Sequence, residues 1–98
     1  MATFVTTFRF TPQGMANIKD TCKRAEAFKA AAKKMGVKVT DQFWTFGPFD
    51  GLLVFEAADE EPATAALLRL GALGNVQTQT ARAFTAAEME QILTRSAS

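Results

Sequence analysis

The stretch that decides the fold runs from residue 37 to residue 57, VKVTDQFWTFGPFDGLLVFEA. Its first part, Val37 to Phe46, is rich in residues that favour strands, and Leu52 to Ala57 is an almost continuous apolar run. Residues 47–51 between them form a turn, because proline cannot donate to a strand ladder and glycine tolerates positive φ. This pattern predicts two neighbouring antiparallel strands, of which the second is buried on both faces in the middle of a sheet.

The flanking sequence adds a helix and an outer strand on each side of this hairpin. The expected elements are a strand over 3–10, a helix over 11–35, strands over 37–46 and 52–57, a helix over 59–74, a strand over 76–84 and a short helix that begins with a capping box at Thr85. The order predicts one α+β domain over 1–98, a ferredoxin-like βαββαβ sandwich with a short C-terminal helix.

Both faces of the predicted sheet carry apolar side chains. Phe4 and Phe8 share one side of the first strand, whereas Val5 lies on the opposite side, and the run over 52–57 is apolar on both sides. Two helices on one face leave the other uncovered, and a monomer rarely exposes an apolar patch of that size. We therefore expect a homodimer in which two sheets pair face to face as a dimeric α+β barrel.

The composition indicates the cellular location of the protein and the kinds of partner that it can bind. No apolar run is long enough to span a bilayer, and the start of the chain lacks the pattern of a signal peptide. A single cysteine excludes an intrachain disulfide, so we expect a cytoplasmic protein that does not act on membranes. The net charge is +1, and the basic residues concentrated between 13 and 38 are interpreted as the solvated face of a helix. Nucleic acid is therefore not an expected partner.

The absence of histidine and tyrosine excludes several kinds of catalytic and metal site. The chain has no histidine, which excludes Ser-His-Asp and Cys-His nucleophilic sites, His-ligated zinc and proximal-His haem. It has no tyrosine, so no phenol can act as an acid or as an oxyanion donor. We expect no metal and no cofactor.

An ordered set of short motifs runs along nearly the whole chain. It comprises Gln13-Gly14, Asn17-Ile18-Lys19-Asp20, Arg24, Phe43-Trp44-Thr45, Gly47, Asp50, residues 70–76 (LGALGNV), Thr78, Thr80 and Arg82-Ala83-Phe84. At these spacings the sequence resembles the GYD-domain family of small bacterial proteins. The resemblance implies a dimeric α+β-barrel fold and implies no activity. The chain departs at the naming motif, because Gly47-Pro48-Phe49-Asp50 stands where the family has Gly-x-Tyr-Asp.

Polar residues suggest two candidate sites near the rim of the sheet. Asn17, Asp20 and Arg24 lie close together on the first predicted helix and could hold an anionic ligand; alternatively, Asp20 and Arg24 form a surface ion pair. Asp50 could act as a general base at the barrel mouth, although an aspartate in a turn more often accepts hydrogen bonds from nearby backbone.

Thr78, Thr80 and Arg82 share one face of the last strand. They could line a cavity in which Arg82 orients a carboxylate, or they could form a threonine ladder of a partly buried strand. Trp44 is expected on the lumen side of the sheet, with a polar partner for its indole N–H. Cys22 is expected on the buried stripe of the first helix.

Three classes of function remain open. The first is a non-catalytic protein that binds a small apolar or anionic ligand, or a stress-related protein of the same shape. The second is a cofactor-independent enzyme, of the isomerase or monooxygenase type, acting on a small apolar molecule in the lumen. The third, an RNA-binding module, is disfavoured because residues 52–56 lack the basic and aromatic signature of the RNA-recognition motif.

Overall fold

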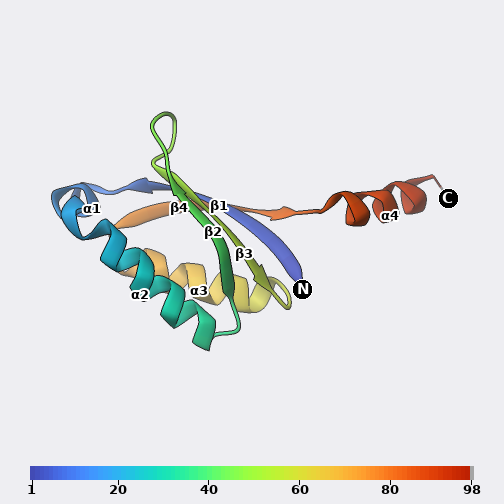
Figure 1. Cartoon of the computed structure of the whole chain (residues 1–98), viewed down its shortest axis with the longest axis horizontal. Coiled ribbons are helices and arrows are strands. Elements are labelled where there is room, and N and C mark those ends of the chain that lie inside the picture. Colours follow the sequence, from blue (N-terminus) through green and yellow to red (C-terminus); the bar gives the residue numbers. More distant parts are fainter. Residues whose placement is uncertain (98) are drawn as a thin grey trace.

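The computed structural model describes residues 1–97 and contains a single four-stranded sheet with helices (Figure 1). In chain order the elements are β1 (Ala2–Phe10), α1 (Pro12–Ala16), a 3-10 turn η1 (Ile18–Asp20), α2 (Thr21–Lys34), β2 (Lys38–Trp44), β3 (Gly51–Ala57), α3 (Glu60–Ala72), β4 (Val76–Ala83) and α4 (Ala86–Ser96).

The strands are arranged in the order β2-β3-β1-β4, and every neighbouring pair is antiparallel. The central position of β3 and β1 and the ferredoxin-like α+β order confirm the prediction. α2 and α3 lie side by side along one face of the sheet (Figure 1). Their shared face forms the core, in which the rings of Phe4 and Phe55 stack with centroids 5.4 Å apart. Thr6 lies in the same layer with no exposed surface, and its hydroxyl is 2.8 Å from that of Thr80.

The single helix predicted over 11–35 is wrong, because the chain breaks into α1, η1 and α2. Asn17 ends α1 with φ −109° and ψ 29°, and its side-chain amide donates to the carbonyl of Gln13. Such local bonding competes with the helical pattern and favours a break. The break shifts the phase of the buried stripe, so α2 buries Phe28 and Ala32 while Cys22 is exposed, contrary to prediction.

A β-bulge between Val39 and Asp41 decides which side chains of β2 face the helices. A bulge inserts one extra residue, so the alternation of side chains reverses beyond it. Trp44 therefore points toward α2, where its Nε1 donates to Thr21 Oγ1 at 3.0 Å. The expected polar partner is confirmed, but the expected face is wrong. Phe43 lies on the open face instead and is 55% exposed.

α4 extends away from the sheet and the other helices (Figure 1). It begins at the capping box predicted at Thr85: the Thr85 N–H donates to Glu88 Oε1 at 2.8 Å, and the Glu88 N–H donates back to Thr85 Oγ1 at 3.2 Å. Its apolar side chains Met89, Ile92 and Leu93 are all exposed. The capping box therefore stabilises the start of the helix, while its apolar side is not buried against the rest of residues 1–97.

Candidate functional site

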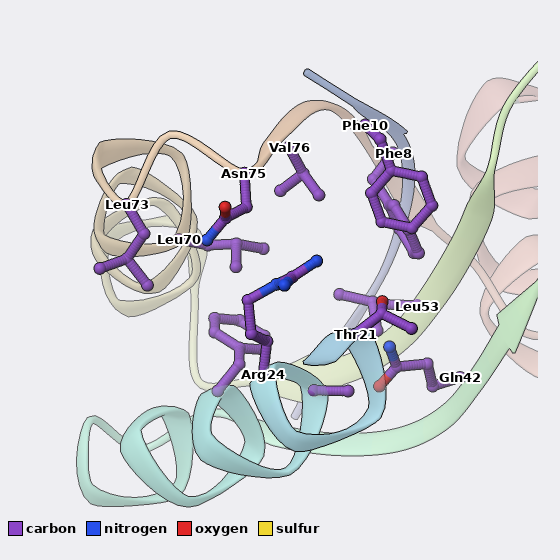
Figure 2. Close-up of a pocket in the computed structure, with 12 residues that line it drawn as sticks. Phe8, Phe10, Thr21, Arg24, Gln42, Leu53, Leu70, Leu73, Asn75 and Val76 are labelled. Carbon is purple, nitrogen blue, oxygen red and sulfur yellow. The ribbon is translucent and has the colours of Figure 1, made fainter. Parts of the chain in front are cut away.

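A small cavity lies between the helix-covered face of the sheet and the helices α2 and α3. Its volume is about 60 Å³. Twelve side chains from all of these elements surround it (Figure 2): Phe8, Phe10, Thr21, Arg24, Ala25, Phe28, Gln42, Leu53, Leu70, Leu73, Asn75 and Val76. Most of these are apolar, so the few polar groups among them define what the cavity can recognise.

Arg24 supplies the positive charge of the cavity. Figure 2 shows its guanidinium reaching from α2 toward the centre of the surrounding side chains. Nη1 donates to the carbonyl of Asn17 at 2.6 Å, and Nη2 donates to the carbonyl of Gly14 at 3.4 Å. A guanidinium has five N–H donors, so these two bonds fix its position and leave further donors available.

α1 and the turn between α3 and β4 together form a frame around this arginine. The Gln13 side chain donates to Leu73 O at 3.0 Å and to Asn75 Oδ1 at 3.1 Å, and Thr11 Oγ1 donates to Gly74 O at 2.5 Å. A Cβ added at Gly14 would lie 2.0 Å from the backbone oxygen of Asn75. α1 therefore fits against the turn only because residue 14 has no side chain.

Gln42 is the second notable polar group at the cavity. Its Oε1 is buried and has no hydrogen-bond partner among the described residues. Buried polar groups are nearly always paired, so an acceptor of this kind needs an explanation. Next to it in Figure 2 lies Thr21, whose hydroxyl accepts the indole N–H of Trp44. Trp44 is thus tied to the rim of the cavity through Thr21.

The other polar residues predicted near the rim of the sheet either stabilise the local structure or have no interaction with Arg24. Asn17 positions Arg24 through its carbonyl. Asp20 is exposed and forms no ion pair with Arg24 within residues 1–97, so the alternative of a surface pair is not found there either. Asp50 fastens the hairpin loop to β1, because its Oδ2 accepts the Phe10 N–H at 2.8 Å.

Thr78, Thr80 and Arg82 do share one face, and they line a groove of about 400 Å³ beside α3. Thr80 is within hydrogen-bond distance of Thr6, so this hydroxyl is already paired. The groove lies at the end of β1 occupied by Phe4, because Phe4 pairs with Arg82, whereas Phe8 and Phe10 at the other end line the small cavity.

Arg82 is surrounded by partners. Its Nη1 donates to the carbonyls of Thr3 and Ala83, and its Nη2 lies 3.6 Å from Glu88 Oε2 at the start of α4. Its Cζ lies 5.6 Å and 4.6 Å from the ring centroids of Phe4 and Phe84, within the range of cation–π attraction. This arginine joins β1, β4 and α4.

The hydrogen bond from the Thr85 N–H is the main reason that the pKa of Glu88 lies below its ordinary value. Desolvation opposes this effect and raises the pKa, whereas the Thr85 hydroxyl and then the charge of Arg82 lower it further. The Glu88 carboxylate is therefore a charged partner of the capping box and of Arg82.

The model of the GYD domain matches residues 4–93 of this sequence. The chain belongs to the GYD-domain family. A curated relative from Thermus thermophilus, the glutamine synthetase and cystathionine beta-lyase binding protein, is 30% identical over 90 residues, which are 91% of this chain and 95% of that protein. The crystal structure of TTHA0845 from the same organism has the same fold, with a TM-score of 0.55 and 22% identity over 88% of this chain and 96% of that one.

In this GYD domain residues 47–50, which differ from the family motif, lie in a loop that is held through hydrogen bonds of its backbone. The Thr45 hydroxyl donates to the Phe49 carbonyl at 2.6 Å, and the Asp50 N–H donates to the Phe8 carbonyl at 2.8 Å. These bonds do not involve the side chain of residue 49. Phenylalanine in place of the family tyrosine therefore leaves them intact.

Sequence reasoning missed several residues of the cavity in this GYD domain. Gln42 was hidden because the bulge that turns it toward the helices has no clear sequence signal. Asn75 follows the helix predicted over 59–74 and has no sequence signal for its contact with Gln13. Within residues 1–97 no helix is long and apolar enough to cross a membrane, and no group of three His, Cys, Asp or Glu side chains is arranged to hold a metal ion.

Proposed function

We propose that this protein is a non-catalytic binding protein whose partners are other proteins. The observation that carries the proposal is α4, a capped helix that leaves the body of the domain with its apolar side chains exposed. The name of the T. thermophilus relative supports it, because that protein is described as binding glutamine synthetase and cystathionine β-lyase. The match extends over nearly the whole of both chains, so it concerns the complete relative and not a fragment of it.

The chemistry of the cavity favours binding over catalysis. Arg24 is the only titratable residue among the described side chains that line it, and a guanidinium does not act as a general base in proteins. The groove beside α3 contains Arg82 and Glu60, but Arg82 is already bonded to two carbonyls and a carboxylate. No observation therefore favours the enzyme alternative.

α4 is suited to docking into an apolar groove of a partner enzyme. Met89, Ile92 and Leu93 lie at helical spacings of three and four residues, which places them on one side of the helix. Amphipathic helices bind grooves through such anchors. Because the capping box already orders the start of the helix, less conformational freedom is lost on binding than for a disordered tail.

Binding of the immobilised protein to purified glutamine synthetase and to cystathionine β-lyase tests this proposal. We expect saturable binding to at least one of them, and a loss of at least tenfold in affinity for Ile92→Glu. Gln91→Glu is the matched control, because it adds the same charge on the opposite side of α4 and should bind normally. If neither enzyme binds, or if both variants bind like the unchanged protein, the proposed partner surface is wrong.

We also propose that the protein forms a homodimer through the open face of its sheet. This face carries Val5, Leu52 and Val54, which are only half-buried in the monomer, together with the exposed Phe43. α2 and α3 lie on the opposite face, so these two helices leave the side chains partly exposed. A second copy presents the same apolar surface, and the contact would be self-complementary as in two-fold dimers.

Light scattering coupled to size exclusion tests the dimer. We expect at least twice the chain mass of 10.6 kDa at micromolar concentration. Val54→Lys should shift the protein toward the monomer, because it would bury an unpaired charge in the contact. Ala65→Lys, on the exposed side of α3, is the control and should leave the mass unchanged. A monomer for the unchanged protein would contradict the proposal.

A further inference from the structure

We propose that the cavity beside Arg24 binds a small aliphatic carboxylate that also carries a hydrogen-bond donor, such as a short hydroxy acid or amino acid. The inference goes beyond the protein-binding role, and it rests on the side chains of the cavity and not on α4 or the open face of the sheet. Three features of the cavity carry it: a positioned cation, an unpaired buried acceptor and a small apolar space.

The cation is Arg24. Its guanidinium is held in place by the carbonyls of Asn17 and Gly14, which are neutral acceptors and leave the charge uncompensated. No carboxylate is found among the described side chains that line the cavity. An arginine that is fixed by carbonyls and still has free donors matches the two oxygens of a carboxylate, which it can bind with a pair of parallel hydrogen bonds.

The frame behind Arg24 supports a binding role. α1 is fastened to the turn after α3 by the bonds of Gln13, and the missing side chain of Gly14 allows the two backbones to touch. The Gly14 carbonyl that accepts from Arg24 is therefore itself part of a rigid contact. A guanidinium oriented before the ligand arrives loses less freedom on binding.

The acceptor is Oε1 of Gln42, which is buried and unpaired among the described residues. A ligand that brings a hydroxyl or an amino group to this oxygen would satisfy it, whereas a plain fatty acid would not. A site built around a buried polar group discriminates strongly against analogues that lack the matching group. Gln42 thus predicts a donor on the ligand in addition to the carboxylate.

The remaining space is small and apolar. A volume of about 60 Å³ is far below the several hundred Å³ of pockets for drug-sized ligands, so nucleotides and sugars are too large. Phe28, Leu53 and Leu70 line it together with the ring of Phe8. These side chains suit an aliphatic part of only a few carbon atoms.

The fluorescence of Trp44 provides the test, because it is the only tryptophan and its indole is bonded to Thr21 at the cavity. Propionate, lactate and alanine would be titrated in parallel, with calorimetry as a second readout. We expect a saturable change with lactate or alanine and an affinity at least tenfold weaker for propionate, which lacks the donor. If lactate binds more tightly than alanine, the preferred donor is a hydroxyl; if alanine binds more tightly, it is an ammonium group.

Variants connect the response to the proposed groups. Arg24→Gln should weaken binding of lactate or alanine at least tenfold, whereas Arg9→Gln, which removes the same charge from an exposed site on β1, should not change it. Equal affinities for Arg24→Gln and the unchanged protein, or no saturable response to any of the three probes, would overturn the site. Equal binding of propionate and lactate would overturn the role of Gln42. Since no partner enzyme is present, none of these outcomes depends on the proposed protein-binding role.

Discussion

A half-buried arginine lies near each end of β1, Arg82 from β4 at one end and Arg24 from α2 at the other, and the two have different roles. Near Phe4, Arg82 contacts two carbonyls, the Glu88 carboxylate and two aromatic rings. Near Phe8, Arg24 donates to two carbonyls, forms no ion pair among residues 1–97 and points into a cavity. The residue type is the same, so the difference lies in the partners. An arginine whose charge is matched within the chain stabilises the fold, and one whose charge is unmatched beside a cavity is available to a ligand.

The origin of this difference lies in which elements reach each end of the sheet. α4 begins directly after β4 and brings Glu88 next to Arg82. At the other end the neighbours of Arg24 are α1 and the turn after α3, which contribute backbone carbonyls and amide side chains instead of a carboxylate. The topology therefore pairs Arg82 with a carboxylate and leaves Arg24 without one among residues 1–97.

The largest expected effect comes from removing the ring beneath Arg82. Phe4 is buried, stacks on Phe55 and lies within cation–π distance of Arg82. Phe4→Ala should lower the free energy of unfolding by about 3–5 kcal/mol in chemical denaturation, because it leaves a large cavity in the core. Phe4→Leu keeps most of the volume and should cost clearly less. Equal stability of Phe4→Ala and the unchanged protein would show that this end is not part of the core.

At the other end, Gly14→Ala should disturb the frame of Arg24. The added methyl group would collide with the backbone oxygen of Asn75, and such overpacking typically costs about 1–3 kcal/mol. Gly71→Ala is the matched control, because this helical position has open space around it and alanine should stabilise it by up to about 1 kcal/mol. Denaturation curves of the two variants should therefore move in opposite directions.

These effects separate what the sequence could predict from what it could not. The alternation over 3–10, the turn at 47–51 and the capping box at Thr85 are local signals, and they predicted the strand order and the start of α4 correctly. The bulge at Val39 and Asp41 has no such signal, because it depends on how β2 fits against β3. It reversed the side of Trp44 and hid Gln42.

The candidate residues divide in the same way. The sequence predicts that both Arg24 and Arg82 are able to hold an anion, since both occur beside polar neighbours in the motifs. Which of them has a carboxylate partner depends on Glu88. This residue lies next to Arg82 because of the direction in which α4 leaves β4. The alternative of an ion pair between Asp20 and Arg24 is not found among residues 1–97, and the break after Asn17 places a carbonyl next to the guanidinium instead.

The difference in stability between the Arg82 and Arg24 variants should be smaller than the effect of Phe4→Ala. Arg82→Gln should cost about 1–3 kcal/mol, because it removes a charged donor from several partners at once. Arg24→Gln should cost no more than about 1 kcal/mol, since its bond to Asn17 is exposed to water. Chemical denaturation of both variants measures the difference. If Arg24→Gln is the more destabilising, the roles assigned to the two ends are reversed.

The smallest effect concerns acid conditions at α4. The folded state lowers the pKa of Glu88 below 4.5, so the carboxylate favours folding above that pH, and its contribution is lost as the pH falls through the lowered pKa. We expect the helical circular dichroism signal to decrease slightly in this range. Glu88→Gln keeps an acceptor for the Thr85 N–H but cannot titrate, so it should remove this part of the pH dependence. An unchanged profile in Glu88→Gln would contradict the assignment.

The most direct test of the contrast between the two arginines is nuclear magnetic resonance of their Nε–Hε groups in ¹⁵N-labelled protein. The signals would be assigned from spectra of Arg24→Lys and Arg82→Lys, and the unchanged protein would then be titrated with lactate and with alanine. We predict that the Arg24 signal shifts and saturates with at least one of them, while the Arg82 signal stays in place. A saturable shift of Arg82 with no change at Arg24 would contradict the account.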